Sequence, residues 1–326
     1  MNICIFGAGA MGGHLATRLA SSGNEVSVIA RGANLEAIRS RGLHLRVNNG
    51  EIHAKPTLAT DRLEEAGHFD LVIVTLKAPS LPSAADAIEG LVAEDGVALF
   101  VTNGIPWWWN HGAGQPGTSL PLLDPAGTMW DRLRTRTIGC VSHSSNEVLS
   151  PGVVQCRSDG PWAIGEPAGT MTSRLSNVRD VFRQAGIPVV IPPDFRKGIW
   201  TKLLLNASLN SVSALTRLDT GILMRDPSLV ALQKEIANEV LKVASSLGCD
   251  LSAEVNLDEV ISIGKRPDNH RTSMLQDVLA SRPIECEAIL GQLIEFACDR
   301  GIETPASKII LTLLRGLDKA LATHEK

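Results

Sequence analysis

A glycine-rich turn at residues 7–12 constrains the fold of this chain more than any other feature. An apolar run over 3–6 leads into Gly7-x-Gly9-x-x-Gly12, and a helical pattern follows over 13–21. In such a strand–turn–helix unit the glycines permit a tight turn, a close backbone approach to a ligand and close helix–strand packing. Because the free N–H groups of a helix start attract anions, the turn predicts a pyrophosphate site formed by Gly7, Ala8, Gly9, Ala10, Met11 and Gly12. The alternative is an ordinary glycine-rich turn.

The end of the second predicted strand, 25–30, indicates which dinucleotide binds. An NAD site usually has Asp or Glu here to bond the ribose 2′-hydroxyl. This chain has Ala30-Arg31-Gly32 instead. A guanidinium can bind a 2′-phosphate through two hydrogen bonds, whereas a carboxylate would repel it. We therefore predict NADP(H) as the cofactor with Arg31 as a ligand, the alternative being a solvated loop arginine.

Two further apolar runs, 70–76 and 96–102, are predicted strands on either side of a helix over 83–91, and they end at Lys77 and Asn103. Strands that alternate with helices predict a parallel, doubly wound sheet of the Rossmann type. Ligands of such sheets bind beyond the carboxyl ends of the strands. Lys77 and Asn103 are therefore expected on the same rim as the glycine turn and Arg31, as cofactor-binding residues.

The rest of the chain divides into two parts. A loop over 106–127, strands near 137–141, 152–156 and 162–165, a helix over 172–185 and a strand over 187–191 complete a predicted NADP-binding domain, 1–192. Beyond Pro192-Pro193 the pattern is helical, which predicts an all-helical domain over 193–326. Its expected helices are 195–215, 229–247, 254–263, 274–279, 283–300 and 306–322. The expected fold class is thus α/β, a Rossmann-type domain followed by a helical one.

Composition excludes several classes of function. The 326 residues carry a net charge of −4, which gives no indication of a nucleic-acid partner. No apolar stretch is long enough to span a membrane, and the N-terminal segment lacks the basic start of a signal peptide. The six cysteines contain no CxxC pair, and the eight histidines show no metal-ligand spacing. We therefore expect a cytoplasmic protein with reduced thiols and no metal site, in which His14 is a packing or surface residue.

A second motif lies in the predicted helical domain. Lys202, Asn206 and Asn210 are spaced i, i+4, i+8 and form one row on an otherwise apolar helix. Because asparagine is a poor helix former, two in one row indicate a hydrogen-bonding role. A buried ammonium can stabilise and protonate the alkoxide that forms when hydride reduces a ketone. We predict that Lys202 and Asn206 are catalytic and that Asn210 binds substrate, the alternative being a solvated polar stripe.

Together these motifs resemble the ketopantoate reductase (2-dehydropantoate 2-reductase) family. The residues that carry the resemblance are the glycine turn with Arg31, Asn103-Gly104, the row Trp200-x-Lys202-Leu203-x-x-Asn206-x-x-x-Asn210, and Ser273-Met-Leu-Gln-Asp277 with Glu285. The resemblance implies NADPH-dependent reduction of ketopantoate to pantoate, for pantothenate and coenzyme A synthesis, and a helical domain like that of 6-phosphogluconate dehydrogenase.

The resemblance also implies roles for single residues. Lys202 would be the general acid, Ser273 would bind the substrate carboxylate and Glu285 a substrate hydroxyl. Asn103 would lie near the nicotinamide and the reacting carbonyl, and Lys77 on the adenosine side. Two simpler interpretations stay open: Ser273-x-x-Gln276 has the form of a capping box, and Glu285 follows Pro283 as a first-turn acid would.

The chain departs from the family pattern after Asn103-Gly104, where Trp107-Trp108-Trp109 begins a long loop in place of a short turn. This loop is an aromatic lid, an apolar wall, a structural loop or an oligomer contact. The alternatives for function are a reductase of another 2-oxo acid or bulkier carbonyl, a non-catalytic NADP(H) sensor, and a β-hydroxyacid or 6-phosphogluconate dehydrogenase, which Ser273 and Glu285 do not support. The expected partners are a small 2-oxo acid and a second copy of the chain in a homodimer.

Overall fold

The computed structural model describes residues 1–112, 117–261 and 270–324, which form two compact units. Unit 1 comprises residues 1–102 and 107–195, and unit 2 comprises 103–106 and 196–326. The division falls three residues beyond the expected boundary after 192, because the Phe195 ring packs against Gly139 and Gly165 of unit 1. The end of the expected helix 254–263 and residues 113–116 of the expected loop lie outside the described residues.

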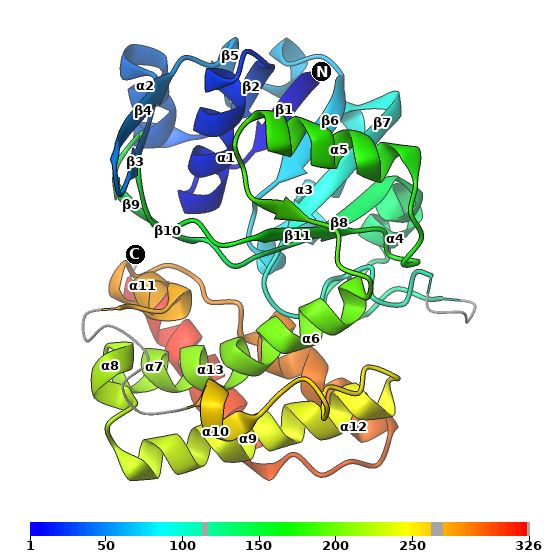
Figure 1. The fold of residues 1–326 in the computed structure, drawn as a ribbon, viewed down its shortest axis with the longest axis vertical. Helices are drawn as coiled ribbons and strands as arrows, with labels where there is room; N and C mark the ends of the chain where they lie inside the picture. Colours follow the sequence, from blue (N-terminus) through cyan, green and yellow to red (C-terminus); the bar gives the residue numbers. More distant parts are fainter. Residues whose placement is uncertain (113–116, 262–269, 325–326) are drawn as a thin grey trace. The chain divides into compact units, whose positions relative to one another are not determined.

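The larger sheet of unit 1 has eight strands in the order β12-β11-β8-β7-β6-β1-β2-β5 (Figure 1). They are β1 (Asn2–Phe6), β2 (Glu25–Ile29), β5 (Leu58–Thr60), β6 (Phe69–Val74), β7 (Val92–Val101), β8 (Thr137–Ser142), β11 (Trp162–Gly165) and β12 (Val189–Val190). The predicted Rossmann-type fold is confirmed, but the sheet is not wholly parallel, because β11 runs antiparallel to β8. Between these two strands the chain passes through a hairpin, not through a crossover helix, and so returns in the opposite direction.

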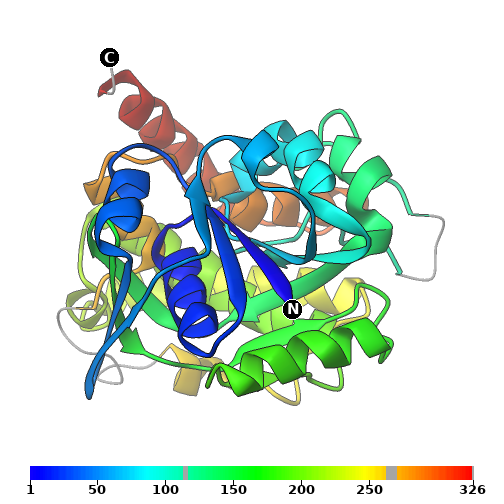
Figure 2. The same cartoon turned by 90° about the horizontal axis from the view of Figure 1, so that it is seen from above.

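Strand order reverses at β1, which has β2 on one side and β6 on the other, so the glycine turn lies at the point where ligands of such sheets bind. The helices of unit 1 are α1 (Ala10–Ser21), α2 (Gly32–Arg41), α3 (Leu81–Leu91), α4 (Thr128–Leu133) and α5 (Ser173–Gln184). Figure 2 shows α1 and α5 on one face of the sheet and α3 on the other. Side chains of α1, α5 and the central strands form one buried apolar cluster, which includes Ile5, Leu15 and Phe182.

A second, four-stranded sheet in the order β4-β3-β10-β9 was not expected from the sequence as a sheet. Its strands are β3 (Leu43–Val47), β4 (Gly50–Ala54), β9 (Ser145–Ser150) and β10 (Val153–Ser158); only a strand at 152–156 was predicted. Helix α1 packs against both sheets of unit 1 (Figure 1). Gly13 makes this packing close, since a Cβ at Gly13 would lie 2.7 Å from Val154 Cγ2 of β10.

The three tryptophans after Asn103-Gly104 are part of the core of unit 1. Trp107, Trp108 and Trp109 are 2%, 2% and 4% exposed. The Trp107 ring meets Phe100 of β7 edge-on with centroids 5.4 Å apart, and the Trp108 ring stacks on Phe195 at 6.2 Å. Of the four interpretations of this segment, the packing therefore favours the structural loop.

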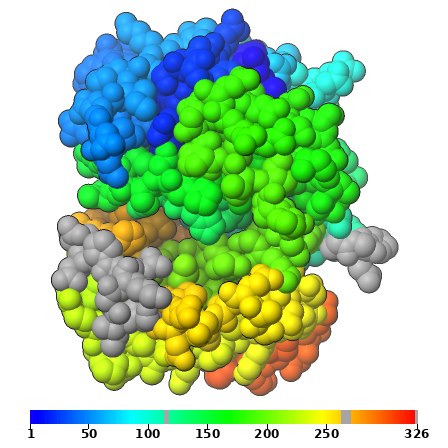
Figure 3. All heavy atoms as spheres, in the orientation of Figure 1, coloured from blue at the N-terminus to red at the C-terminus, as the bar shows by residue number. Residues whose placement is uncertain are grey.

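Unit 2 is helical. Its helices are α6 (Phe195–Leu205), α7 (Ser211–Thr216), α8 (Thr220–Leu223), α9 (Pro227–Ser246), α10 (Leu257–Val260), α11 (Ser273–Leu279), α12 (Gln292–Asp299) and α13 (Pro305–His324). Two π-helical turns interrupt the expected helices 195–215 and 283–300, namely η4 (Asn206–Asn210) and η5 (Glu287–Gly291). The space-filling view in Figure 3 shows α9 on one surface of unit 2. Within the described ranges, no helix is long and apolar enough to cross a membrane.

A buried carboxylate joins α9 to the start of α13. Glu239 is 6% exposed, and its carboxylate accepts hydrogen bonds from Ala306 N at 2.9 Å, Ser307 N at 2.8 Å and Ser307 Oγ at 2.5 Å. These donors include N–H groups in the first turn of α13, which have no partner within their own helix. The negative charge also complements the positive end of the helix dipole.

We predict that Glu239→Ala lowers the free energy of unfolding by about 2–4 kcal/mol, because buried donors lose a charged acceptor. Urea unfolding followed by circular dichroism measures the change. The matched control is Glu235→Ala, one turn earlier on α9, where the side chain is exposed and the expected change is within about 0.5 kcal/mol. Equal losses in the two variants would contradict a structural role for the buried carboxylate.

Candidate functional site

The β1–α1 turn of unit 1 is held in place by sterics and by two hydrogen bonds. Gly7 has φ of +103°, a conformation that favours glycine. Its N–H donates to Ile29 O at 3.0 Å, and its carbonyl oxygen accepts from Thr75 Oγ1 at 2.6 Å. A Cβ at Gly12 would lie 1.9 Å from Gly7 O, so no other residue fits there without moving the turn. The third glycine thus has the packing role that the sequence predicts.

Gly9 differs from the other two glycines because protein packing does not require it. A Cβ built at Gly9 meets no described atom within 4 Å, and its φ of −72° is open to any residue. Gly9 is also the N-cap of α1, and no described side chain caps this helix start. An open backbone at an uncapped helix N-terminus fits the approach of a pyrophosphate. The residues of the turn therefore fit the diphosphate of a dinucleotide.

The two predicted cationic ligands, Arg31 and Lys77, each lie just beyond the carboxyl end of a strand of the larger sheet. Arg31 comes after β2, is exposed and is the N-cap of α2. Among the described residues its guanidinium has no ion-pair partner. Lys77 follows β6, is partly buried and precedes a short 3₁₀ turn, Ala78–Ser80. The carboxyl ends of β1, β2 and β6 are adjacent in the sheet, so the turn, Arg31 and Lys77 share one rim.

Two residues that support the turn were missed by the sequence analysis. Thr75 holds Gly7 O, and Asn34 donates through Nδ2 to Ala8 O at 2.5 Å. Asn34 Oδ1 also accepts from Gly152 N at 2.7 Å, which ties α2 to the turn between β9 and β10. Thr75 carried a signal, as a polar residue at the end of an apolar run. Asn34 carried none, because its partners are distant in sequence.

The predicted polar row of unit 2 lies across a π-helical turn instead of a regular helix. Lys202 is on α6 and is half-buried, not fully buried as the hypothesis of a buried ammonium assumed. Asn206 and Asn210 are the first and last residues of η4, and Asn210 Nδ2 donates to Asn206 Oδ1 at 2.9 Å. Turns of this type are frequent at functional sites.

Asn206 has an unused hydrogen-bonding group. The residue is 6% exposed, and its Nδ2 is buried without a hydrogen-bond partner in the described part of the chain. A buried amide group without a partner costs about 1–3 kcal/mol. Such a group in a native structure needs an explanation, and a ligand oxygen is one.

Asn103 and Glu285 form a second polar pair in unit 2. Asn103 Nδ2 donates to Glu285 Oε2 at 3.2 Å, and Glu285 is 8% exposed. The backbone after Asn103 is anchored, since Ile105 N donates to Ala288 O at 2.7 Å. Gly104 has φ of +80°, and a Cβ there would lie 2.4 Å from Ala288 O, which explains why glycine follows Asn103. The structure thus brings together two residues that are 182 positions apart.

Ser273 begins α11, but the capping-box interpretation is wrong. The N-cap is Thr272, whose Oγ1 accepts from Leu275 N at 3.2 Å, and Ser273 is an exposed first helical residue. Glu285 is buried and lies before the helical residues that begin at Cys286, so it is outside the first helical turn. The turn η4 packs against both α11 and η5 in unit 2. Burial raises the pKa of the adjacent Cys286 thiol to about 12, which leaves it neutral.

Comparison with known proteins places these features in one family. The family model of the ketopantoate reductase PanE/ApbA matches residues 3–113, and the model of its C-terminal part matches 194–318. A 2-dehydropantoate 2-reductase of Mesorhizobium japonicum is 36% identical over 97% of this chain and 98% of its own. One from Pyrococcus horikoshii is 26% identical over 97% of each chain.

Solved structures of proteins from the same family are also similar to this chain. The crystal structure of a Ralstonia solanacearum MolK2 protein of the same family is 31% identical, covers 98% of both chains and superposes with a TM-score of 0.89. A 2-dehydropantoate 2-reductase from Geobacter metallireducens GS-15 has a TM-score of 0.84 at 27% identity, over 97% of this chain and 99% of its own. The glycine turn, the Asn-Gly pair and the polar row of unit 2 fall within the matched ranges, and the chain belongs to the ketopantoate reductase family.

Proposed function

We propose that this protein reduces 2-dehydropantoate (ketopantoate) to pantoate with NADPH. Family membership sets the reaction class. The observation that carries the proposal within the structure is the Lys202–Asn206–Asn210 row, in which a buried amide nitrogen has no partner among the described residues. A row of this kind offers a proton donor and oriented hydrogen-bond donors to a substrate carbonyl and its neighbours.

The glycine turn of unit 1 is the proposed cofactor site, formed by Gly7, Ala8, Gly9, Ala10, Met11 and Gly12. When bound, NADPH supplies the hydride. The N–H groups at the start of α1 bind the pyrophosphate, and Arg31 binds the 2′-phosphate with its guanidinium. Lys77 adds positive charge on the adenosine side.

A pair of glycine variants tests this site. Gly9→Ala is expected to leave the thermal unfolding midpoint nearly unchanged and to weaken NADPH binding at least about 10-fold, because the added methyl meets ligand and not protein. Gly12→Ala is expected to lower the unfolding midpoint as well, since its Cβ would overlap Gly7 O. Differential scanning fluorimetry and NADPH fluorescence titration measure the two effects. Wild-type NADPH affinity in Gly9→Ala would refute the proposed site.

A charge variant tests cofactor choice. Arg31→Ala is expected to weaken NADPH binding about 10- to 100-fold and NADH binding little, because only NADPH carries the 2′-phosphate. The matched control is Arg39→Ala, whose Nε donates to Ala59 O at 2.8 Å within unit 1 and is not part of the proposed site. If Arg31→Ala weakened the two cofactors equally, Arg31 would not bind the 2′-phosphate.

In the proposed mechanism Lys202 donates the proton. As the C2 ketone accepts hydride, negative charge develops on its oxygen, and the Lys202 ammonium stabilises and then protonates it. Asn206 accepts from Asn210 through Oδ1 and therefore has its Nδ2 left to orient the reacting group. Asn210 binds substrate beside it.

The remaining proposed contacts hold the other ends of the substrate. Glu285 accepts a hydrogen bond from a substrate hydroxyl, and Asn103, already bonded to Glu285, lies near the reacting carbonyl. Ser273 binds the substrate carboxylate. Its position supports this role, because a first helical residue presents its N–H and hydroxyl at a positive helix end.

Steady-state assays of NADPH oxidation test the reaction. We predict that the wild-type protein reduces ketopantoate with kcat/KM above ~10⁴ M⁻¹s⁻¹ and that Lys202→Ala lowers kcat by about 10²- to 10⁴-fold without loss of NADPH affinity. The control is Lys197→Ala, on the same helix, where the ammonium is paired with Glu254 at 2.7 Å. Its kcat is expected to stay near the wild-type value.

The same assay separates the alternatives. Turnover of only bulkier 2-oxo acids would move the substrate assignment, and NADPH binding without turnover would favour a sensor. The buried packing of Trp107 and Trp108 removes the observation that motivated a bulkier substrate.

A homodimer and a cytoplasmic location are further proposals. The exposed apolar pair Ile309 and Leu313 on α13 supports the homodimer, and the six free cysteines support the cytoplasmic location.

A further inference from the structure

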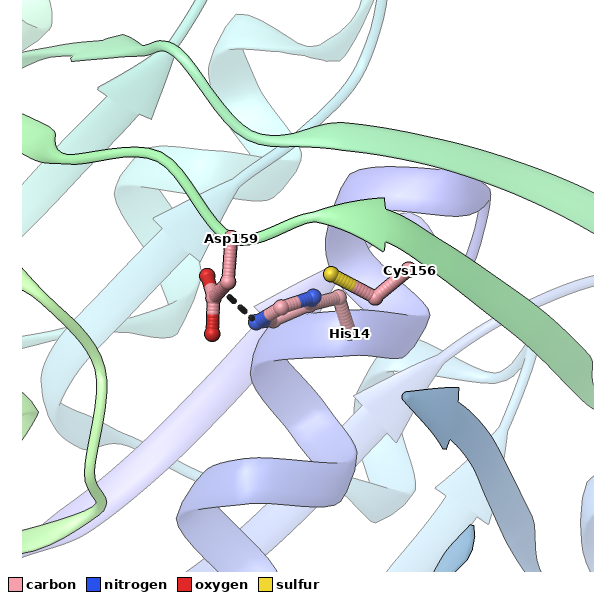
Figure 4. A group of neighbouring side chains, drawn as sticks. All are labelled: His14, Cys156 and Asp159. Atoms are coloured by element: carbon pink, nitrogen blue, oxygen red, sulfur yellow. Dashed lines mark ion pairs between the residues drawn. The ribbon is translucent and has the colours of Figure 1, made fainter. Parts of the chain in front are cut away.

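Three side chains of types that bind metal ions lie together in unit 1, next to the glycine turn, since Asn146 bonds both His14 and Met11. His14 of α1, Cys156 of β10 and Asp159, just after β10, turn their side chains toward one another (Figure 4). One nitrogen, the sulfur and one carboxylate oxygen all lie within 4.8 Å of one another. Cys156 and Asp159 are three positions apart, but His14 comes from a distant segment, so no sequence spacing indicates the full set.

Hydrogen bonding determines which nitrogen of His14 carries its proton. His14 Nδ1 is 2.9 Å from Asn146 Oδ1. Asn146 Nδ2 donates to Ser144 Oγ at 3.0 Å, which leaves Asn146 Oδ1 as the acceptor. Nδ1 is therefore the donor, and Nε2 presents its lone pair to Asp159.

Two acceptor atoms then face each other in a buried place. His14 Nε2 and Asp159 Oδ1 are 3.7 Å apart, and neither has a hydrogen-bond partner among the described residues. His14 is fully buried. The other carboxylate oxygen, Oδ2, accepts from Arg18 Nη2 at 2.6 Å, so Oδ1 is held toward His14. Two buried acceptors without a donor between them are unfavourable, and a cation between them removes the conflict.

We propose that His14 Nε2, Cys156 Sγ and Asp159 Oδ1 bind a divalent transition-metal ion of the zinc type, with water as the fourth ligand. Zinc takes N, S and O ligands at bond lengths that place tetrahedral ligand atoms about 3.3–3.6 Å apart. The 3.7 Å separation of Nε2 and Oδ1 is slightly wider than this range, and Cys156 Sγ, within 4.8 Å of the other two ligand atoms, would move closer on binding. The Asp159 side chain is 23% exposed, which provides an entry path and room for the water.

The side chains that bond the three proposed ligands are arranged like the second shell of a metal site. Asn146 fixes the His14 tautomer, and Arg18 orients the Asp159 carboxylate, as second-shell partners do at metal sites. Burial raises the pKa of the Cys156 thiol, so the metal ion must displace its proton, which passes to solvent. A bound ion would join α1 to the second sheet. The site is independent of the proposed reductase activity.

Cobalt and zinc titrations of the full-length, chelator-treated protein test the proposal. We expect one Co²⁺ per chain with a thiolate-to-cobalt charge-transfer band, displacement of Co²⁺ by Zn²⁺, and a higher unfolding temperature with Zn²⁺. Cys156→Ser is expected to abolish the band, and Asn146→Ala to weaken Zn²⁺ binding about 10- to 100-fold. The control Cys298→Ser, at an exposed thiol, is expected to bind as the wild type does.

Circular dichroism and NADPH titration establish that each variant is folded. A folded wild-type protein without the charge-transfer band would overturn the proposal, as would a band that persists in Cys156→Ser. If Cys156→Ser does not fold, Asp159→Asn provides the second test, because it removes a charged ligand at a partly exposed position. Unchanged Zn²⁺ affinity in Asp159→Asn would equally overturn the site.

Discussion

The close approach of α1 to β1 is the constraint on which unit 1 depends. With a Cβ position at Gly12 only 1.9 Å from Gly7 O, the helix can start where it does only because residue 12 has no side chain. The same helix then meets the second sheet through Gly13 and Val154. One helix, placed by one steric condition, thereby follows the glycine turn at its start and packs against two sheets along its length.

The two glycines of the turn that look alike in sequence have different physical roles. Gly12 is required by the protein itself, whereas Gly9 borders space that the described residues leave open. The packing of the protein therefore requires glycine at residue 12 but not at residue 9. The spacing of the glycines in the sequence does not reveal which of them the packing of the protein requires.

Unit 2 shows how a helical region can carry a polar site. Both π-helical turns lie near predicted site residues, with Asn206 and Asn210 in η4 and Glu285 two residues before η5. Widened turns disturb the regular backbone ladder, a cost that native proteins retain mostly where function needs it. The buried carboxylate of Glu239 is fully bonded, whereas the Asn206 amide is one of several buried polar groups of the unit without a partner among the described residues, with Gln233, Gln292 and Thr304.

Much of the fold was predictable, because each element that was predicted correctly has a local signal. The apolar run 3–6 with its glycines, the run 70–76 and the helical periodicity after Pro193 all depend on neighbours a few residues apart. The strand at 43–47 also has an alternating apolar pattern, Leu43-His-Leu-Arg-Val47, from which it could have been predicted. The antiparallel β11, the π-helical turns and the burial of the tryptophans had no such signal, because each depends on packing between distant segments.

The sequence by itself determined the Rossmann-type order, the helical second part and the candidate rows of site residues. Glycine spacing, strand ends and helical periodicity are properties of a short stretch of chain. Only the tertiary structure decided that Asn103 bonds Glu285 and that His14 faces Cys156 and Asp159. These facts depend on which distant segments fold against each other, and that is decided by the burial of the whole apolar core instead of by any local pattern.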